Sequence, residues 1–259
     1  MLDRREFLKL MAAGTAAGVM ATAPLAAAAR LTALTSNPKF KAVAFDAYTI
    51  FDPRPIFALV EKLYPGKGTE FGRVWRSKQF DYAWQRLLAG YYEDFWKITQ
   101  DALVYAAHMQ KVELTQEKRE RLLAACLMLK AWPEVPLALG TLKEMGVRLA
   151  FLSNFTPMML EANVKSAGLK GVFDHIISTD AAKTYKPAPA AYQLGLDTLK
   201  LTREEILFVP FAGWDTAGAK MFGLKTFWVD RLGLPLEELG VTPDAKGSSL
   251  AEVVSYVRG

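Results

Sequence analysis

The 259-residue sequence predicts an α/β fold, a doubly wound parallel sheet with a helical part inserted into it. Two observations lead to this prediction. Short apolar runs with strand character alternate with helical patterns in the second half of the chain, which is typical of parallel sheets. In addition, residues 54–131 are rich in aromatic residues, Arg and Gln at helical spacing, and this stretch is far longer than a βα crossover needs.

The expected elements can be given in chain order. The strands are the apolar runs at 43–45, 147–153, 175–178, 206–211 and 226–229. The helices between the later strands are 157–168, 189–200 and 213–223. We expect residues 38–53 and 132–259 to form the catalytic core and residues 54–131 to form a helical cap. Pro53 and the WPEVP segment around Pro133 are the expected hinges between the two.

The first 29 residues have the composition of an export signal. Arg4 and Arg5 precede Phe7 and Leu8, and a stretch rich in Ala and Gly ends in an alanine run suited to A-x-A cleavage. This pattern resembles a twin-arginine signal. An amphipathic helix of the fold is disfavoured because the segment has no wide stripe of large apolar residues. We therefore expect export by the twin-arginine route, membrane contact only during export, and a periplasmic protein.

Composition and charge exclude several classes of function. The net charge is +5 and no dense cluster of Lys and Arg indicates a nucleic-acid partner. The single cysteine, Cys126, cannot form a disulfide within the chain. The two histidines, His108 and His175, are far apart in the sequence, so a His-based metal site or a Ser-His-Asp triad has little to build on.

Polar side chains follow the ends of the expected core strands. Asp46 follows the first strand, and Ser153 and Asn154 end the second. Lys186 lies beyond the third strand, and Asp215 follows the fourth. Because the carboxyl ends of parallel strands lie along one edge of the sheet, we expect these residues to converge on a site built around a nucleophile. Taken singly, each residue also has an ordinary structural explanation, such as a helix cap or a turn.

Several motifs extend this pattern over most of the chain. They are FDAY (45–48), WRSKQFDYAW (75–84), YYEDF (91–95), FLSN (151–154), TYKP (184–187) and GWDTAGAKMFG (213–223). With them, residues 41–259 resemble the haloacid dehalogenase superfamily, and within it the type II L-2-haloacid dehalogenases. The resemblance implies a Rossmann-like core, a helical cap, no metal or other cofactor, and commonly a homodimer.

The resemblance also implies catalytic roles for four residues, and it places Asn154 beside them as a substrate-binding residue. Asp46 would be the nucleophile that attacks the halogen-bearing carbon and forms an ester with inversion. Lys186 would keep the Asp46 carboxylate ionised, and Asp215 would position Lys186 and the hydrolytic water. Arg76, from the cap, and Asn154 would hold the departing halide, which fits a charge that develops during the reaction.

Five further residues are implied to bind substrate. Ser153 would hold the substrate carboxylate. Tyr48 and Tyr192 would complete the wall of the pocket, and Phe95 and Trp214 would supply its apolar surface. Arg76 also has a competing explanation, because it lies on a predicted helix that carries many polar side chains.

The implied reaction is hydrolytic dehalogenation of short (S)-2-haloalkanoic acids, which yields the inverted 2-hydroxy acid and a halide. One alternative is a phosphatase of the same superfamily. Such phosphatases have a second Asp two residues after the nucleophile, where this chain has Tyr48. A leaving halide needs no proton, so Tyr48 favours carbon–halogen cleavage. The other alternative is a degenerate, non-catalytic protein that binds small carboxylates.

The sequence departs from the family pattern in two places. The family turn has the pattern D-x-Y-G-T-L-F-D, but this chain lacks the glycine after Tyr48. The turn that contains Thr49 must therefore differ from the turn in the family. A serine and an asparagine of the family are replaced by Pro210 and Ala212, whose side chains cannot hydrogen-bond. We therefore expect the network around Lys186 and the hydrolytic water to lose two partners, and ester hydrolysis to be slow.

Overall fold

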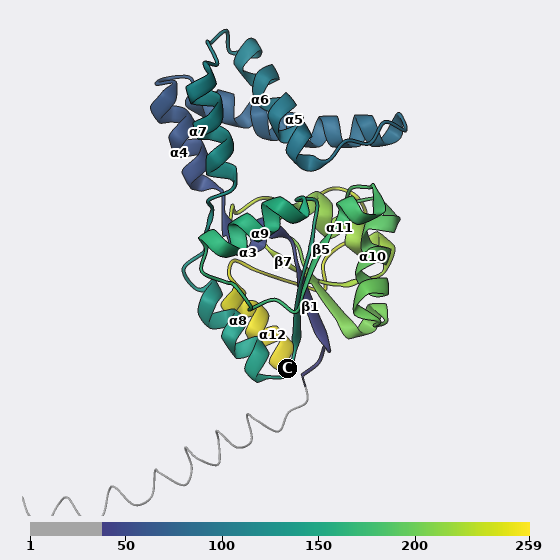
Figure 1. The fold of residues 1–259 in the computed structure, drawn as a ribbon. Coiled ribbons are helices and arrows are strands. Elements are labelled where there is room, and N and C mark those ends of the chain that lie inside the picture. Colours follow the sequence, from purple (N-terminus) through teal and green to yellow (C-terminus); the bar gives the residue numbers. More distant parts are fainter. Residues whose placement is uncertain (1–37) are drawn as a thin grey trace, which may run out of the picture. The chain divides into compact units, whose positions relative to one another are not determined.

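The computed structural model describes residues 38–259, and the expected export signal at 1–29 lies outside this part of the chain. A six-stranded sheet in the order β5-β4-β1-β6-β7-β8 forms its centre (Figure 1). All its pairings are parallel, which confirms the predicted α/β class. The strands are β1 (Ala42–Phe45), β4 (Arg148–Ser153), β5 (His175–Ser178), β6 (Ile206–Val209), β7 (Lys225–Val229) and β8 (Ala245–Gly247).

Helices cover both faces of this sheet, as a doubly wound fold requires (Figure 1). The central strand β1 turns Val43 and Phe45 to one face and Ala42 and Ala44 to the other, with the period of two that strands impose. The first face packs against α8 (Val135–Glu144), α9 (Pro157–Ser166) and α12 (Leu250–Arg258), and the second against α10 (Pro189–Leu199) and α11 (Gly213–Phe222).

The segment expected to be the cap is helical. It contains α4 (Arg54–Leu63), α5 (Gly68–Leu88), α6 (Phe95–Met109) and α7 (Gln116–Cys126). Buried polar contacts join α5 to α6, because Trp75 Nε1 donates to Thr99 O at 2.9 Å and Gln79 Nε2 donates to Thr99 Oγ1 at 2.9 Å. Among residues 38–259, no helix has both the length and the apolar composition needed to cross a bilayer.

Two short strands connect this helical segment to the sheet. β2 (Phe51–Asp52) pairs with β3 (Lys130–Ala131) in an antiparallel ribbon. A short helix, α3 (Ala47–Ile50), lies between β1 and β2. The sequence patterns predict none of these three elements, nor β8, because each is too short to show a period. The same holds for the 3₁₀ turns η1 (Thr179–Ala182) and η2 (Arg203–Glu205).

One predicted strand is too long. The run 206–211 was expected to be a strand, but β6 ends at Val209. Pro210 has no N–H and cannot extend the ladder, although its carbonyl still accepts from Val229 N at 3.3 Å. Ala212 is the N-cap of α11, which begins at Gly213, so the chain turns at the carboxyl edge of the sheet directly after β6.

We expect Gly218→Ala to destabilise the protein, because α11 packs closely against the segment that follows Lys186. A Cβ at this position would overlap Pro187 and lie 2.7 Å from the Tyr192 hydroxyl. Overpacking of this kind typically costs about 1–3 kcal/mol, measurable as a lower free energy of unfolding in urea. Gly140→Ala in α8 is the control, since its added Cβ meets no atom within 4 Å and should stabilise the helix by roughly 0.5–1 kcal/mol. Equal stability of the two variants would contradict the close packing at Gly218.

Candidate active site

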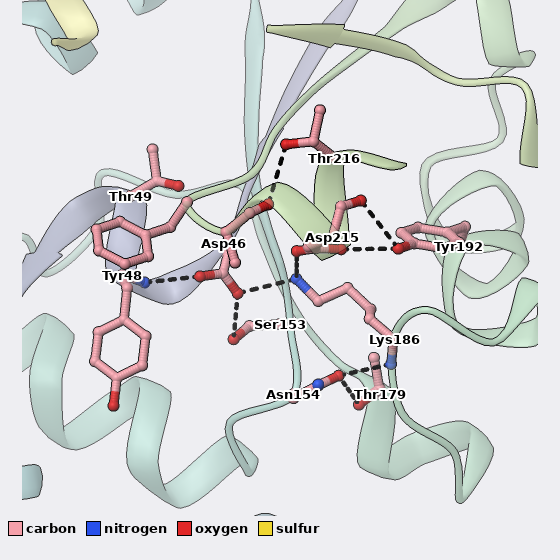
Figure 2. Close-up of polar contacts among 12 residues, drawn as sticks. Asp46, Tyr48, Thr49, Ser153, Asn154, Thr179, Lys186, Tyr192, Asp215 and Thr216 are labelled. Atoms are coloured by element: carbon pink, nitrogen blue, oxygen red, sulfur yellow. Dashed lines mark hydrogen bonds and ion pairs between the residues drawn. The ribbon is translucent and has the colours of Figure 1, made fainter. Parts of the chain in front are cut away.

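The carboxyl edge of the sheet brings together the polar residues that follow neighbouring strands (Figure 2). Asp46 follows the central strand β1, Ser153 ends β4, and Asp215 lies in the first turn of α11 after β6. Lys186 enters from the segment between η1 and α10. The convergence of these four residues that parallel strands predict is therefore present in the structure.

The centre of the site is the Lys186 ammonium group, which lies between two carboxylates. Lys186 Nζ donates to Asp46 Oδ1 at 2.9 Å and to Asp215 Oδ2 at 2.6 Å, and its side chain is fully buried. Burial acts to lower the pKa of Lys186, but the negative charges of Asp215 and Asp46 outweigh it and raise the pKa. The ammonium group therefore stays charged, because a buried cation is tolerated only where it is paired.

The Asp46 carboxylate caps the helix that follows it and also belongs to the polar cluster of the site. Its Oδ2 accepts from Tyr48 N at 3.0 Å, so it caps α3. Its Oδ1 accepts from Lys186 Nζ, and Ser153 Oγ lies 3.5 Å away. Phe155 N donates to Ser153 Oγ at 3.2 Å and fixes that hydroxyl. One carboxylate oxygen is thus held by the helix backbone and the other by the lysine.

Asp215 is anchored on its other side by Tyr192. The Tyr192 hydroxyl donates to Asp215 Oδ1 at 2.8 Å. Burial raises the pKa of Asp215 to about 6, although the Lys186 charge opposes the shift. Burial also raises the pKa of Tyr192 well above its ordinary value, so the phenol remains a neutral donor. Tyr192, which was expected to complete the pocket wall, is fully buried beside Asp215 and is not among the groups that line the cavity.

A small cavity opens in front of the Asp46 carboxylate. Its volume is about 20 Å³, roughly the space of one water molecule. Tyr48, Phe95 and Trp214 line it, as expected. Phe80 and Phe155 also line it and were not predicted; Phe80 lies in the WRSKQFDYAW motif, but a lone phenylalanine there carries no signal of a pocket. A substrate that enters this space displaces water and meets mostly aromatic surface.

Two buried donors at this cavity have no hydrogen-bond partner among residues 38–259. They are Arg76 Nη1 and Asn154 Nδ2. The Asn154 amide is oriented by its oxygen, which accepts from Lys186 N at 2.9 Å and from Thr179 Oγ1 at 3.1 Å. Arg76 Cζ lies 4.3 Å from the centre of the Tyr48 ring. A buried donor without a partner costs free energy, so the cavity is suited to an anion that accepts from both.

The helical segment contacts the Lys186 region through three further hydrogen bonds. Trp84 Nε1 donates to Lys186 O at 3.0 Å, and the Tyr92 hydroxyl donates to Asp180 Oδ1 at 2.8 Å. The Tyr185 hydroxyl donates to Glu93 O. The sequence does not predict these contacts, although Trp84 and Tyr185 lie within the motifs WRSKQFDYAW and TYKP.

Comparison with known proteins identifies the family. A family model described as haloacid dehalogenase-like hydrolase matches residues 40–223. The chain belongs to this family. Within the family it groups with the L-2-haloacid dehalogenases, as the motifs predict.

Curated and solved relatives cover nearly all of the described chain. Haloacetate dehalogenase H-2 of Moraxella sp. (strain B) is 43% identical over 80% of this chain and 92% of the relative. An (S)-2-haloacid dehalogenase of Pseudomonas sp. (strain YL) is 40% identical over 83% of this chain and 93% of the relative. The Xanthobacter autotrophicus L-2-haloacid dehalogenase with chloropropionic acid covalently bound has a TM-score of 0.79 at 35% identity, over 85% of this chain and 99% of that one.

The departures from the family pattern have local consequences in this dehalogenase-family chain. The shortened turn after Asp46 is helical, and Thr49 Oγ1 donates to Val209 O at 2.9 Å, which ties the turn to β6. Pro210 and Ala212 contribute only backbone groups; Ala212 O accepts from Thr216 Oγ1 at 3.0 Å. Lys186 keeps both of its carboxylate partners, Asp46 and Asp215, although the side chains at 210 and 212 cannot hydrogen-bond.

The raised pKa of Asp215 predicts a pH dependence of stability that Asp215→Asn removes. The ordinary pKa is 3.8 and the folded value is about 6, so the folded protein binds more protons between these values. The stabilisation from this group is therefore fully present below pH 3.8 and is lost as the pH rises through about 6. Two units of pKa correspond to roughly 3 kcal/mol. Urea unfolding of both proteins at several pH values from 4 to 7 measures this difference, and parallel profiles would contradict the shift.

Proposed function

We propose that this enzyme hydrolyses the carbon–halogen bond of short (S)-2-haloalkanoic acids through an ester on Asp46. One observation carries the proposal: the Asp46 carboxylate, paired with Lys186, shares a small aromatic cavity with two buried donors, Arg76 Nη1 and Asn154 Nδ2, that have no partner among residues 38–259. A nucleophile and a site for a leaving anion are the two groups that this substitution needs. The relatives named (S)-2-haloacid dehalogenases support the same reaction.

In the first step, a carboxylate oxygen of Asp46 attacks the carbon that bears the halogen. The new C–O bond forms as the carbon–halogen bond breaks, the bonding pair leaves with the halide, and the carbon inverts. Arg76 and Asn154 donate hydrogen bonds to the halogen as it leaves. Because its negative charge grows during the step, these donors stabilise the transition state more than the bound substrate and so lower the barrier. The Ser153 hydroxyl, close to Asp46, is placed to hold the substrate carboxylate.

In the second step, water attacks the Asp46 ester carbonyl. The water oxygen bonds to the Asp46 carboxyl carbon as Asp215 takes a proton from the water, and the bond between this carbon and the ester oxygen breaks. The ester oxygen leaves as the hydroxyl of the 2-hydroxy acid, taking up that proton, and the acid keeps its inverted configuration. Asp215 is the nearest unprotonated base at neutral pH, since its pKa of about 6 leaves it mostly ionised. Pro210 and Ala212 offer no side-chain partner to this water, so we expect the second step to be slower than the first.

The small, mostly aromatic cavity favours short acids over bulky ones. Its space of about 20 Å³ is bounded by aromatic rings that are themselves packed on one another, such as Phe95 on Phe155 at 5.9 Å between ring centres.

A metal-dependent phosphatase is a weaker candidate. The cation between the two carboxylates is Lys186 itself, and the residue two positions after Asp46 is Tyr48. Burial raises the pKa of Tyr48 to about 12, so its phenol does not exchange protons at neutral pH. Within residues 38–259, no group of three or more His, Cys, Asp or Glu is arranged to hold a metal ion. We infer a reaction that needs neither metal nor other cofactor.

A homodimer is also part of the proposal. An apolar groove of about 800 Å³ is lined by Trp84 and Leu88 of α5 and by Met221 and Phe222 of α11. Leu88 is 88% exposed and Met221 is 59% exposed. Apolar surface of this extent is costly in water, and a second copy of the chain would cover it.

Halide release tests the proposed reaction. Mixing the enzyme with (S)-2-chloropropionate should give a burst of chloride of roughly one equivalent and a mass increase on the peptide that contains Asp46, followed by slower turnover. Asp46→Asn should fold but give neither, because an amide is isosteric without being nucleophilic. The control is Asp81→Asn, a half-buried residue whose ion-pair partner among residues 38–259 is Lys78 on α5; it should behave as wild type.

Three other outcomes discriminate between the candidates. No chloride from wild-type enzyme would favour the non-catalytic carboxylate binder. Loss of activity in EDTA, or magnesium-dependent hydrolysis of p-nitrophenyl phosphate, would favour the phosphatase. Equal activity on the (R) enantiomer would contradict the (S) assignment. With the nucleophile and the halide site in fixed positions, a substrate of one configuration places its halogen in the halide site.

The export route is a separate proposal, supported by the Arg4-Arg5 pair and the Ala-rich stretch that follows it. A reporter joined to residues 1–37 should reach the periplasm, and the double variant Arg4→Lys with Arg5→Lys should stay in the cytoplasm although its charge is unchanged. Lys9→Gln is the control, since it removes a nearby charge outside the pair. Unchanged export of the double variant would contradict the twin-arginine route.

A further inference from the structure

We propose that Trp132 and Arg231 are positioning residues for the nucleophile, because they hold the short helix α3 that orients the Asp46 carboxylate. This inference rests on the proposed function, since it concerns the step in which Asp46 attacks. Neither residue touches the cavity in front of Asp46, so both act through the backbone of α3.

The reason lies in the length of α3. A helix of four residues can satisfy few of its own carbonyl groups, because the partner N–H lies four residues further on. Ala47 O accepts from Phe51 N, but the next three carbonyls lie at the end of the helix. Buried carbonyls without partners cost free energy, so α3 depends on donors from elsewhere in the chain.

Trp132 and Arg231 supply a donor to each of these three carbonyls. Trp132 Nε1 donates to Tyr48 O at 3.0 Å, and Trp132 N donates to Ile50 O at 3.1 Å. Arg231 Nη2 donates to Thr49 O at 3.0 Å. The carboxyl end of α3 is therefore capped from outside by two residues that are distant in the sequence.

The amino end of the same helix determines the geometry of Asp46. Tyr48 N donates to Asp46 Oδ2, and Thr49 N donates to Asp46 O at 3.2 Å. Because α3 is a single turn, a shift of its carboxyl end moves these N–H groups as well. The line of attack of the Asp46 carboxylate thus depends on donors at the far end of the turn.

Arg231 is itself held in place. Its side chain is only 6% exposed, and the same Nη2 donates to Glu134 Oε1 at 2.7 Å. The guanidinium carbon lies 4.4 Å from the centre of the Trp132 ring. A buried guanidinium with a carboxylate partner has little freedom, so it can hold a backbone carbonyl at a fixed position.

The two residues also lie at the connection between the helical segment and the sheet. Trp132 directly follows β3, and β2 directly follows α3. Arg54, the first residue of α4, packs on the same ring, with its guanidinium carbon 4.6 Å from the ring centre. Arg54 makes its hydrogen bonds to Asp52 and none to α3, so it provides a matched control.

The test compares Arg231→Met with Arg54→Met, each of which removes one guanidinium from the Trp132 ring. In Arg231→Met, amide hydrogen exchange of the peptide 46–52 should become about tenfold faster, as expected for a lost hydrogen bond to a buried carbonyl. The rate of ester formation should fall roughly a hundredfold with KM changed less than about threefold, because a misaligned nucleophile impairs attack more than binding. Arg54→Met should change neither quantity.

Trp132→Phe is the second variant, in case Arg231→Met does not fold. It removes the indole donor and keeps an aromatic ring. We again expect a lower rate of ester formation with little change in KM. Unchanged exchange at 46–52 in both variants would overturn the inference whatever the activity of the enzyme. Faster exchange with an unchanged rate of ester formation would also overturn it, because the residues would then be merely structural. A wild-type enzyme that releases no halide would overturn the proposed function instead, while the exchange data would still decide whether α3 is held in this way.

Discussion

The site depends on one buried ion pair network, in which every polar group of Lys186 has a partner. Its ammonium group bonds to Asp46 and Asp215, its N–H donates to Asn154 Oδ1, and its carbonyl accepts from Trp84. Taking an ammonium group out of water is costly, so these partners must be in place when the protein folds. The chain segments that supply them, the ends of β1 and β4 with α5 and α11, are thereby fixed relative to one lysine.

This arrangement also orients the donors for the leaving group. Because the Asn154 oxygen is occupied by Lys186 N and by Thr179, the amide nitrogen must point into the cavity. Trp84 binds the Lys186 carbonyl and lies on the same helix, α5, as Arg76. The contact that fixes α5 against Lys186 therefore limits where the Arg76 guanidinium can lie. A single lysine couples the ionisation of the nucleophile to the geometry of the halide site.

Sequence reasoning predicted the parts of this site that follow from the geometry of a parallel sheet. Asp46, Ser153 and Asp215 each follow an apolar run, and such strand ends must meet along one edge. Contacts to backbone carbonyls could not be predicted, because any residue supplies a carbonyl and the donors are remote. Arg231, for example, lies 182 positions from the Thr49 carbonyl that it binds. The contact of Tyr192 with Asp215 could not be predicted either, because spacing cannot tell a side chain that lines a pocket from one that supports a neighbouring residue.

In the proposed mechanism, the departures at Pro210 and Ala212 act on one half of the reaction. Ester formation uses groups from several elements, and the hydrogen bonds of Asp46, Lys186 and Asn154 involve no side chain of the 210–212 segment. Ester hydrolysis needs a water held against the Asp46 carbonyl. Asp215 is the base available for it, but its two oxygens already accept from Lys186 and Tyr192. A base engaged on both oxygens positions water less well than one assisted by neighbouring hydroxyl or amide groups. The fold can therefore keep the nucleophile fully prepared while release of the product becomes the slow step.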